Sequence, residues 1–221
     1  RVRPGREAHP LMWFFSFFGL PVELGTHWVD RVPVFTWTIA ALITVASLIG
    51  FIDLTATAET WGFISEAPLR HGGLTLLTSF LLHGGWFHLL SNLYFLVVFG
   101  DNIEVQQGPR RLLGLLLVAT LAGDLLHLIA LPGSSIPAIG ASGGISGVML
   151  AYATLFPRAR LGMLVFFFPL RIPIWTYIAL WLMAQVYGTM MMSDDSTVGY
   201  AAHLGGALVG IAAGYLWRKR G

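Results

Sequence analysis

Four polar side chains with catalytic potential stand within apolar stretches of the sequence. A charged group in bilayer hydrocarbon costs roughly 2.5–3.5 kcal/mol, so polar residues in such stretches need an internal partner or a function. His88 and Asn92 are four residues apart and therefore share one helix face. Ser142 and His203 each stand near glycines, which allow two helices to approach closely.

The chemistry that fits these residues is acyl transfer by an activated serine. A hydroxyl is a poor nucleophile until an adjacent base takes its proton, and a neutral imidazole with a reference pKa of about 6.5 suits that task. We expect Ser142 to begin a helix, where free backbone N–H groups stabilise an anion, and His88 and Asn92 offer further donors. Each residue alone is typical of helix packing, but the four together favour a serine hydrolase site.

The elements that must position these residues are membrane spans. The 221 residues are 56% hydrophobic and 11% charged, with a mean hydropathy of +0.72, whereas soluble domains carry about 25% charged residues. This composition excludes an ordinary soluble globule and argues against a disordered chain. At about 20 apolar residues for each span, the sequence predicts an all-α membrane protein with six spans, at residues 32–54, 86–100, 112–131, 142–155, 174–190 and 198–217.

Positive charge predicts the orientation of these spans. If the N-terminus is cytoplasmic, every Lys and Arg except Arg70 falls on the inner side. We therefore expect both termini in the cytoplasm, in a bacterial or archaeal plasma membrane. Residues 1–31 are expected to form a cytoplasmic and interfacial segment, with 10–24 lying on the membrane surface, and residues 32–221 to form the six-span domain.

This orientation places the candidate residues near the outer ends of the second, fourth and sixth spans, at one level in the membrane. Glycines recur at every fourth position of the sixth span, at Gly206, Gly210 and Gly214. Such a stripe lets two helix backbones approach closely. We infer that the fourth and sixth spans cross there and bring Ser142 Oγ within hydrogen-bond reach of His203.

Composition also limits cofactors and partners. The chain has no cysteine, which excludes disulfides, thiolate metal sites and a thiol nucleophile. No metal or organic cofactor is expected. The arginines are scattered through loops and ends, so they indicate membrane topology and no nucleic-acid partner. The oligomeric state and the natural substrate stay open.

Four short motifs extend the pattern around the candidate residues. They are His-Gly-Gly-Trp-Phe-His-Leu-Leu-Ser-Asn at 83–92, Gly-x-x-x-Glu at 100–104, Gly-Ala-Ser-Gly at 140–143 and Ala-His-Leu-Gly-Gly at 202–206. With these motifs in this order, the sequence resembles the rhomboid family of intramembrane serine proteases. The resemblance covers residues 32–217, and four ordered motifs are far more specific than Gly-x-Ser-Gly alone.

The resemblance implies a six-helix bundle with a short, central fourth helix and a cavity open to the outside. It implies an endopeptidase that cleaves transmembrane segments of other proteins in the lipid bilayer, with a Ser-His dyad and no third acid. Ser142 would be the nucleophile and His203 the general base, while His88, Asn92 and the Ser142 amide would line the oxyanion hole. The fifth span would be a lateral gate for the substrate, with Trp181 and Gln185 on one of its faces.

Two positions depart from the family pattern. Ser146 stands where well-known bacterial members carry an aromatic residue that stacks on the catalytic imidazole, so either Ser146 bonds His203 or another ring holds the imidazole. Leu74 and Thr75 stand where some members carry a Trp-Arg pair, so the first outer loop should meet lipid differently.

We expect the other polar residues within or near the spans to have structural roles. Asp124 and His127 are three apart in the third span and are expected to satisfy each other. Glu104 is expected to bond loop backbone near the inner face, and His83 to join a network around the cavity.

Two other functions remain open at this stage. An inactive rhomboid-like protein would bind transmembrane helices without cleaving them, although such relatives commonly lose the serine or the histidine, and this chain keeps both. An ion or proton transporter would use Asp124, His127, His83 and His88 as a relay, but the inner halves of the spans offer almost no polar path.

Overall fold

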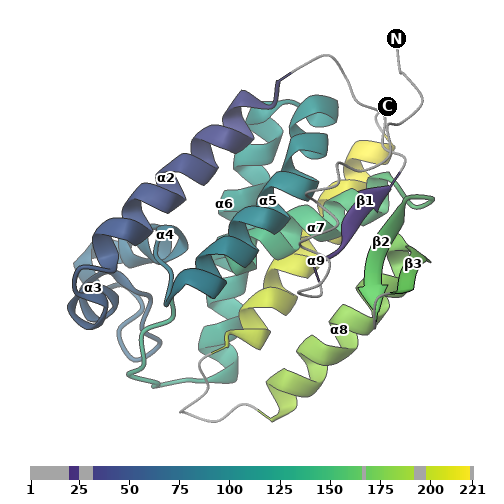
Figure 1. Ribbon diagram of the computed structural model, residues 1–221. Coiled ribbons are helices and arrows are strands. Elements are labelled where there is room, and N and C mark those ends of the chain that lie inside the picture. Colours follow the sequence, from purple (N-terminus) through teal and green to yellow (C-terminus); the bar gives the residue numbers. More distant parts are fainter. Residues whose placement is uncertain (1–19, 25–31, 166–167, 192–197, 220–221) are drawn as a thin grey trace.

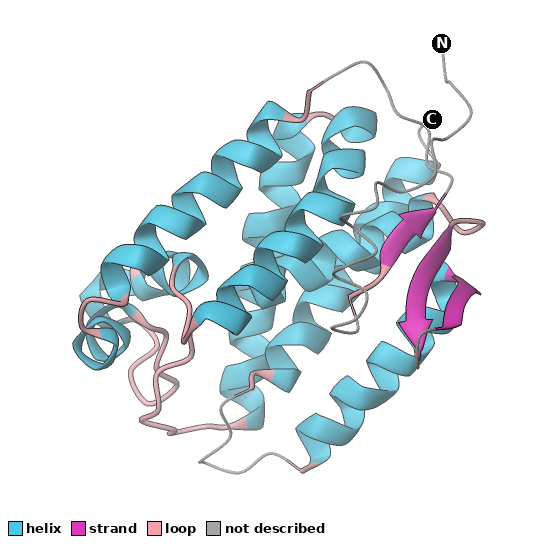
Figure 2. Cartoon of the chain, viewed as in Figure 1, coloured by secondary structure: helices cyan, strands magenta, loops and turns pink. Residues whose placement is uncertain are grey.

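The computed structural model describes residues 20–24, 32–165, 168–191 and 198–219, and this part of the chain is mostly helical (Figures 1 and 2). Residues 1–19, with most of the predicted interfacial segment, lie outside the described residues. The helices are α2 (Val34–Gly50), α3 (Leu54–Trp61), the 3-10 turn η1 (Arg70–Gly73), α4 (Thr75–Leu81), α5 (Trp86–Gln107), α6 (Pro109–Ala130), α7 (Ser142–Leu155), α8 (Ile174–Met190) and α9 (Tyr200–Arg218).

Helix α7 is short and central, as the resemblance implies. It has 14 residues, and every residue from Gly143 to Thr154 is buried. Helices α5, α6 and α9 pack around it. The glycine stripe makes the closest contact, because a Cβ built on Gly206 would lie 1.9 Å from the carbonyl oxygen of Gly143. The predicted close crossing of the fourth and sixth spans is therefore confirmed.

Among the described helices, α6 is long and apolar enough to cross a membrane alone. Two bent pairs would bring the number to three if each is one span: α2 with α3, bent by 119°, and α4 with α5, bent by 94°. The first pair corrects the predicted span at 32–54, because the chain turns at residues 51–53. The side chain of Asp53 accepts a hydrogen bond of 3.0 Å from the backbone N–H of Ala56 and so begins α3 as a separate helix. The count of six spans stays a prediction.

A small sheet corrects the expectation of an all-α protein. Strands β1 (Val22–Leu24), β2 (Arg160–Val165) and β3 (Phe168–Pro173) pair antiparallel in the order β1-β2-β3. Strand β3 contains Pro169 and ends at Pro173, and proline lacks the N–H that a helix interior needs. Antiparallel pairing with β2 instead gives the backbone N–H and C=O groups between α7 and α8 their hydrogen-bond partners. Strand β1 takes the end of the segment that was predicted to lie on the membrane surface.

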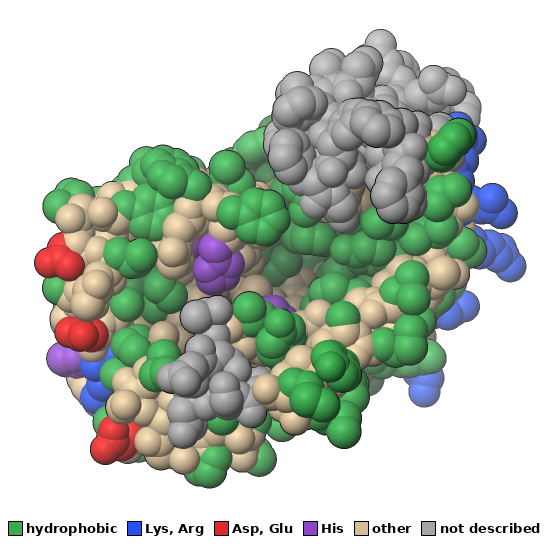
Figure 3. Space-filling view, turned by 60° about the horizontal axis from the view of Figure 1, so that its bottom comes forward, with side chains coloured by type: hydrophobic (Ala, Val, Ile, Leu, Met, Phe, Trp, Pro, Cys, Tyr) green, Lys and Arg blue, Asp and Glu red, His purple; other side chains and the backbone are tan. Residues whose placement is uncertain are grey.

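Charge separates along the molecule. Figure 3 shows most Lys and Arg side chains at one end and Asp and Glu side chains at the other. Arg70 is the exception that the sequence predicts, and it is held by the backbone carbonyls of Glu59 and Gly62. These local bonds explain how a lone arginine is accommodated among acidic residues.

Glu104 links the C-terminal part of α5 to the start of α2. Its carboxylate accepts hydrogen bonds from the backbone N–H of Phe35 at 3.0 Å, and from the N–H and hydroxyl of Thr36 at 2.7 and 2.8 Å. Free N–H groups in the first turn of a helix need such acceptors. The expected bond from Glu104 to backbone is present, and its partners belong to the first turn of α2.

Candidate active site

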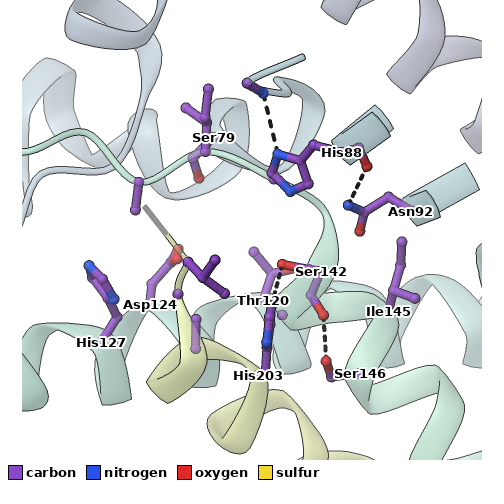
Figure 4. Close-up of a pocket in the computed structure, with 18 of the residues that line it drawn as sticks. Ser79, His88, Asn92, Thr120, Asp124, His127, Ser142, Ile145, Ser146 and His203 are labelled. Carbon is purple, nitrogen blue, oxygen red and sulfur yellow. Dashed lines mark hydrogen bonds between the residues drawn. The ribbon is translucent and has the colours of Figure 1, made fainter. Parts of the chain in front are cut away.

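Ser142 and His203 meet in the structure although 61 residues separate them in the sequence. Ser142 is the first residue of α7, and His203 lies in the first turn of α9. The Oγ atom of Ser142 lies 2.8 Å from Nε2 of His203 (Figure 4). This geometry allows the imidazole to take the hydroxyl proton directly.

The loop before α7 leads Ser142 into this position. Gly140 has a φ of 136°, which lies in the region that favours glycine, and its N–H donates to the carbonyl of Ser79 at 2.9 Å. A Cβ at Gly140 would lie 2.8 Å from the His88 ring. Glycine is therefore the residue that lets the loop pass beside His88 and present the N-terminus of α7 to the cavity.

His203 is held from helix α8. Its Nδ1 atom lies 2.7 Å from Oε1 of Gln185, whose side chain is 6% exposed. The rings of Trp181 and Tyr200 lie 6.1 and 6.5 Å from the imidazole, between centroids. Ser146 instead donates to the carbonyl oxygen of Ser142 at 2.6 Å. Rings from α8 and α9 thus contact the imidazole where the family pattern has an aromatic residue on α7.

His88 and Asn92 face the same cavity from α5. The backbone N–H of Gly84 donates to Nδ1 of His88 at 3.3 Å, and Asn92 donates from Nδ2 to the carbonyl of His88 at 2.8 Å (Figure 4). Both side chains line the cavity with Ser142, although no hydrogen bond joins either one to Ser142 among the described residues. Both side chains therefore lie beside the space in front of the serine.

His83 joins a buried network beside this space, as predicted. Its Nδ1 atom lies 3.0 Å from the Ser47 hydroxyl, and its Nε2 atom accepts from the Ala141 N–H at 3.5 Å. Its ring meets the His88 ring edge-on, with centroids 4.8 Å apart. His83 therefore links α2 to the residue before the serine and supports the His88 ring.

The cavity has a volume of about 690 Å³ and is lined by residues from α5, α6, α7, α8 and α9. Figure 3 shows a hollow in this face of the molecule, with hydrophobic side chains around it and histidine visible. Most of the exposed area inside it is apolar. Among the described residues, no group of three His, Asp or Glu side chains has metal-binding geometry.

The predicted pairing of Asp124 with His127 is wrong. Asp124 Oδ2 and His127 Nδ1 are buried without a hydrogen-bond partner in the part of the chain that the structure describes. The physical reason is the orientation of the imidazole, which packs edge-on against Phe63 with centroids 6.4 Å apart. Spacing of three on a helix brings two side chains near each other, but it does not make their polar atoms face.

The comparisons with known proteins agree with this geometry. A family model described as Rhomboid domain matches residues 70–220. The chain belongs to the rhomboid family. As a rhomboid protein it is an integral membrane protein, and its matched region contains Ser142, His203 and Gln185.

Named relatives come from several organisms. Rhomboid protein 1, mitochondrial, of Saccharomyces cerevisiae is 25% identical over 92% of this chain and 60% of its own length. RHOMBOID-like protein 12, mitochondrial, and Rhomboid-like protein 11, chloroplastic, of Arabidopsis thaliana are 32% and 31% identical, over 71% and 65% of this chain and 50% and 52% of their own lengths. The chain thus spans half to three fifths of these relatives. Their names lend no support to the expected bacterial or archaeal plasma membrane.

The sequence does not predict two contacts in and beside the site. The family resemblance puts the Gln185 side chain on a gate face and does not predict its bond to His203. The one available signal was a lone amide in an apolar helix, since a buried amide needs a partner. The Ser47–His83 bond had no signal, because a serine in an apolar helix ordinarily bonds its own backbone.

Proposed function

We propose that this rhomboid protein is a serine endopeptidase that cleaves transmembrane segments of other membrane proteins. The single observation that supports the proposal most strongly is the 2.8 Å contact between Ser142 Oγ and His203 Nε2 beside a cavity. A helix-binding protein without activity has no need of a hydroxyl and an imidazole in this arrangement.

In the proposed reaction, His203 Nε2 takes the proton of Ser142 as Oγ attacks the scissile carbonyl. The oxyanion accepts hydrogen bonds from the Ser142 N–H at the start of α7 and from the side chains of His88 and Asn92. His203 then protonates the leaving amine, and the peptide C–N bond breaks to leave an acyl-enzyme. Water, deprotonated by His203, hydrolyses this ester and restores the Ser142 hydroxyl.

The substrate in this proposal is a transmembrane helix that reaches the cavity from the lipid. A helix protects its peptide bonds with its own hydrogen bonds, so the segment must unwind before Ser142 attacks. Glycine or proline near the scissile bond lowers the cost of unwinding by about 1–3 kcal/mol for each residue. Helix α8 would be the side of entry and gate, where Trp181 lines the cavity and Gln185 bonds His203. Six spans with both termini in the cytoplasm complete the proposal.

A cleavage assay tests this proposal. The full chain, purified in detergent, is mixed with a fluorescently tagged single-span protein that has glycine in the outer part of its span. Ser142→Ala and His203→Ala should each abolish cleavage, because each removes one partner of the proton transfer. Thr154→Val is the matched control on α7, since its hydroxyl bonds only the carbonyl of Leu150 in the described structure.

The control should cleave like the wild type. Cleavage retained by purified Ser142→Ala would contradict the assignment of the nucleophile. Wild-type protein that binds the span but neither cleaves it nor reacts at Ser142 with a fluorophosphonate would instead identify an inactive helix-binding protein.

A further inference from the structure

We propose that Gln185 is a positioning residue for His203, so that the site works as a hydrogen-bonded chain of Ser142, His203 and Gln185. This inference rests on the proposed protease function and assigns a third member to a site that otherwise has two. The two contacts of the imidazole carry it: Nε2 to Ser142 Oγ at 2.8 Å and Nδ1 to Gln185 Oε1 at 2.7 Å.

The orientation of the Gln185 amide is fixed by a second bond. Its Nε2 atom donates to the backbone carbonyl of Trp181 at 3.2 Å, one turn earlier on α8. A carbonyl oxygen can only accept, so this bond assigns the nitrogen and leaves Oε1 facing His203. An acceptor at this place requires the proton of a neutral imidazole to be on Nδ1. Nε2 is then unprotonated and accepts the hydroxyl proton of Ser142.

Burial explains why this bond is strong enough to select the tautomer. Most of α8 is exposed on the surface of the molecule, and its buried residues are Ile174, Ile178, Gln185 and Gly188. A buried amide left without a partner costs about 1–3 kcal/mol, and His203 is the partner of Gln185 Oε1. The opposite tautomer of His203 would present a lone pair to this oxygen and lose the bond.

The contact between α8 and α9 keeps the two side chains in register. A Cβ on Gly188 would lie 2.5 Å from the Tyr200 ring, so the helices touch there one turn from Gln185. The Trp181 ring, one turn before Gln185 on α8, is tilted by 33° to the imidazole of His203. Because Gln185 comes from α8 while Ser142 and His203 come from α7 and α9, displacement of α8 would release Nδ1 and impair the base.

Two substitutions in the full chain separate positioning from packing. Gln185→Met keeps the length of the side chain and removes the acceptor, so kcat should fall about 10- to 100-fold with little change in KM. Gln185→Glu keeps an acceptor and should restore most of the rate. A carboxylate also stabilises the imidazolium, so the acidic limb of the pH–rate profile should move to higher pH.

Other ionisable groups surround the imidazole and stay constant in this comparison. His88 on α5 and Asp124 and His127 on α6 line the same cavity, and Tyr200 contacts the ring from α9. Thr189→Val is the matched control on α8, because among the described residues its hydroxyl bonds only the backbone carbonyl of Gln185. It should leave kcat and the pH–rate profile as in the wild type.

Nitrogen NMR of the histidine side chains in detergent tests the inference without any substrate. Wild-type His203 should carry its proton on Nδ1, and Gln185→Met should shift the population toward the other tautomer. A wild-type proton on Nε2, or Gln185→Met with wild-type kcat and pH profile, would overturn the role of Gln185 while leaving the protease intact. Equal losses in Gln185→Met, Gln185→Glu and Thr189→Val would assign Gln185 to packing alone. Wild-type protein without cleavage or Ser142 labelling would overturn the protease proposal itself.

Discussion

Gly206→Ala should separate α9 from α7 and disable the site without removing a candidate catalytic group. The added Cβ would lie 1.9 Å from the carbonyl oxygen of Gly143 and 2.8 Å from its carbon. Both neighbours are backbone, so no side chain can turn away. Cβ atoms essentially never approach another atom closer than 3.0 Å, so the two helices must part by at least 1.1 Å at this point.

The size of the effect follows from the position of this contact. Gly206 is three residues from His203 and Gly143 is next to Ser142, so the displacement acts directly on the 2.8 Å contact between imidazole and hydroxyl. A separation near 3.9 Å no longer makes a hydrogen bond. Misplacement by about 1 Å lowers catalysis by roughly 100-fold, and overpacking in a tight core costs about 1–3 kcal/mol of stability.

Cleavage of the tagged single-span substrate and thermal unfolding in detergent measure the two effects. The matched control is Gly114→Ala on α6, where an added Cβ meets nothing within 4 Å. Both substitutions gain about 1 kcal/mol of helix propensity, so a difference between them reports the contact with α7. A Gly206→Ala protein with the kcat of the wild type would show that the crossing of α7 and α9 does not position Ser142 against His203.

Two further substitutions test stability through thermal unfolding of the purified protein. Glu104→Gln should lower the free energy of unfolding by about 1–2 kcal/mol, because the carboxylate accepts three hydrogen bonds at the start of α2. An unchanged melting temperature would contradict this role. Asp124→Leu should raise the free energy of unfolding by about 1–3 kcal/mol, because it removes a buried carboxylate oxygen that has no partner among the described residues. A lower melting temperature would show that Asp124 stabilises the fold.

Local sequence signals predicted the central helices well. The predicted fourth and fifth spans, 142–155 and 174–190, begin and end at the same residues as α7 and α8. Glycine and proline next to apolar runs fixed these boundaries, since Gly140 adopts a positive φ and Pro173 immediately precedes α8. The predicted second span stops at residue 100, but α5 continues to Gln107, and in this last part Glu104 bonds the first turn of α2.

Hydrophobic periodicity does not predict which distant segments of the chain pair with each other. Strand β1 pairs with β2 across about 140 residues, with Val22 opposite Gly162, and nothing in either segment specifies the other. The dyad was predictable because the small-residue stripe on α9 reports which face meets α7. Helix α8 has no such pattern, so the sequence did not show that Gln185 turns toward His203.

Fluorophosphonate labelling of the purified protein tests the activated serine most directly, because this probe reacts with a serine whose proton has been taken by a base. We predict one modified residue, Ser142, identified by mass spectrometry of the peptides, and loss of the label in His203→Ala with its folding retained. Label on another residue, or equal labelling of Ser142 in His203→Ala, would contradict a hydroxyl activated by the imidazole 2.8 Å away.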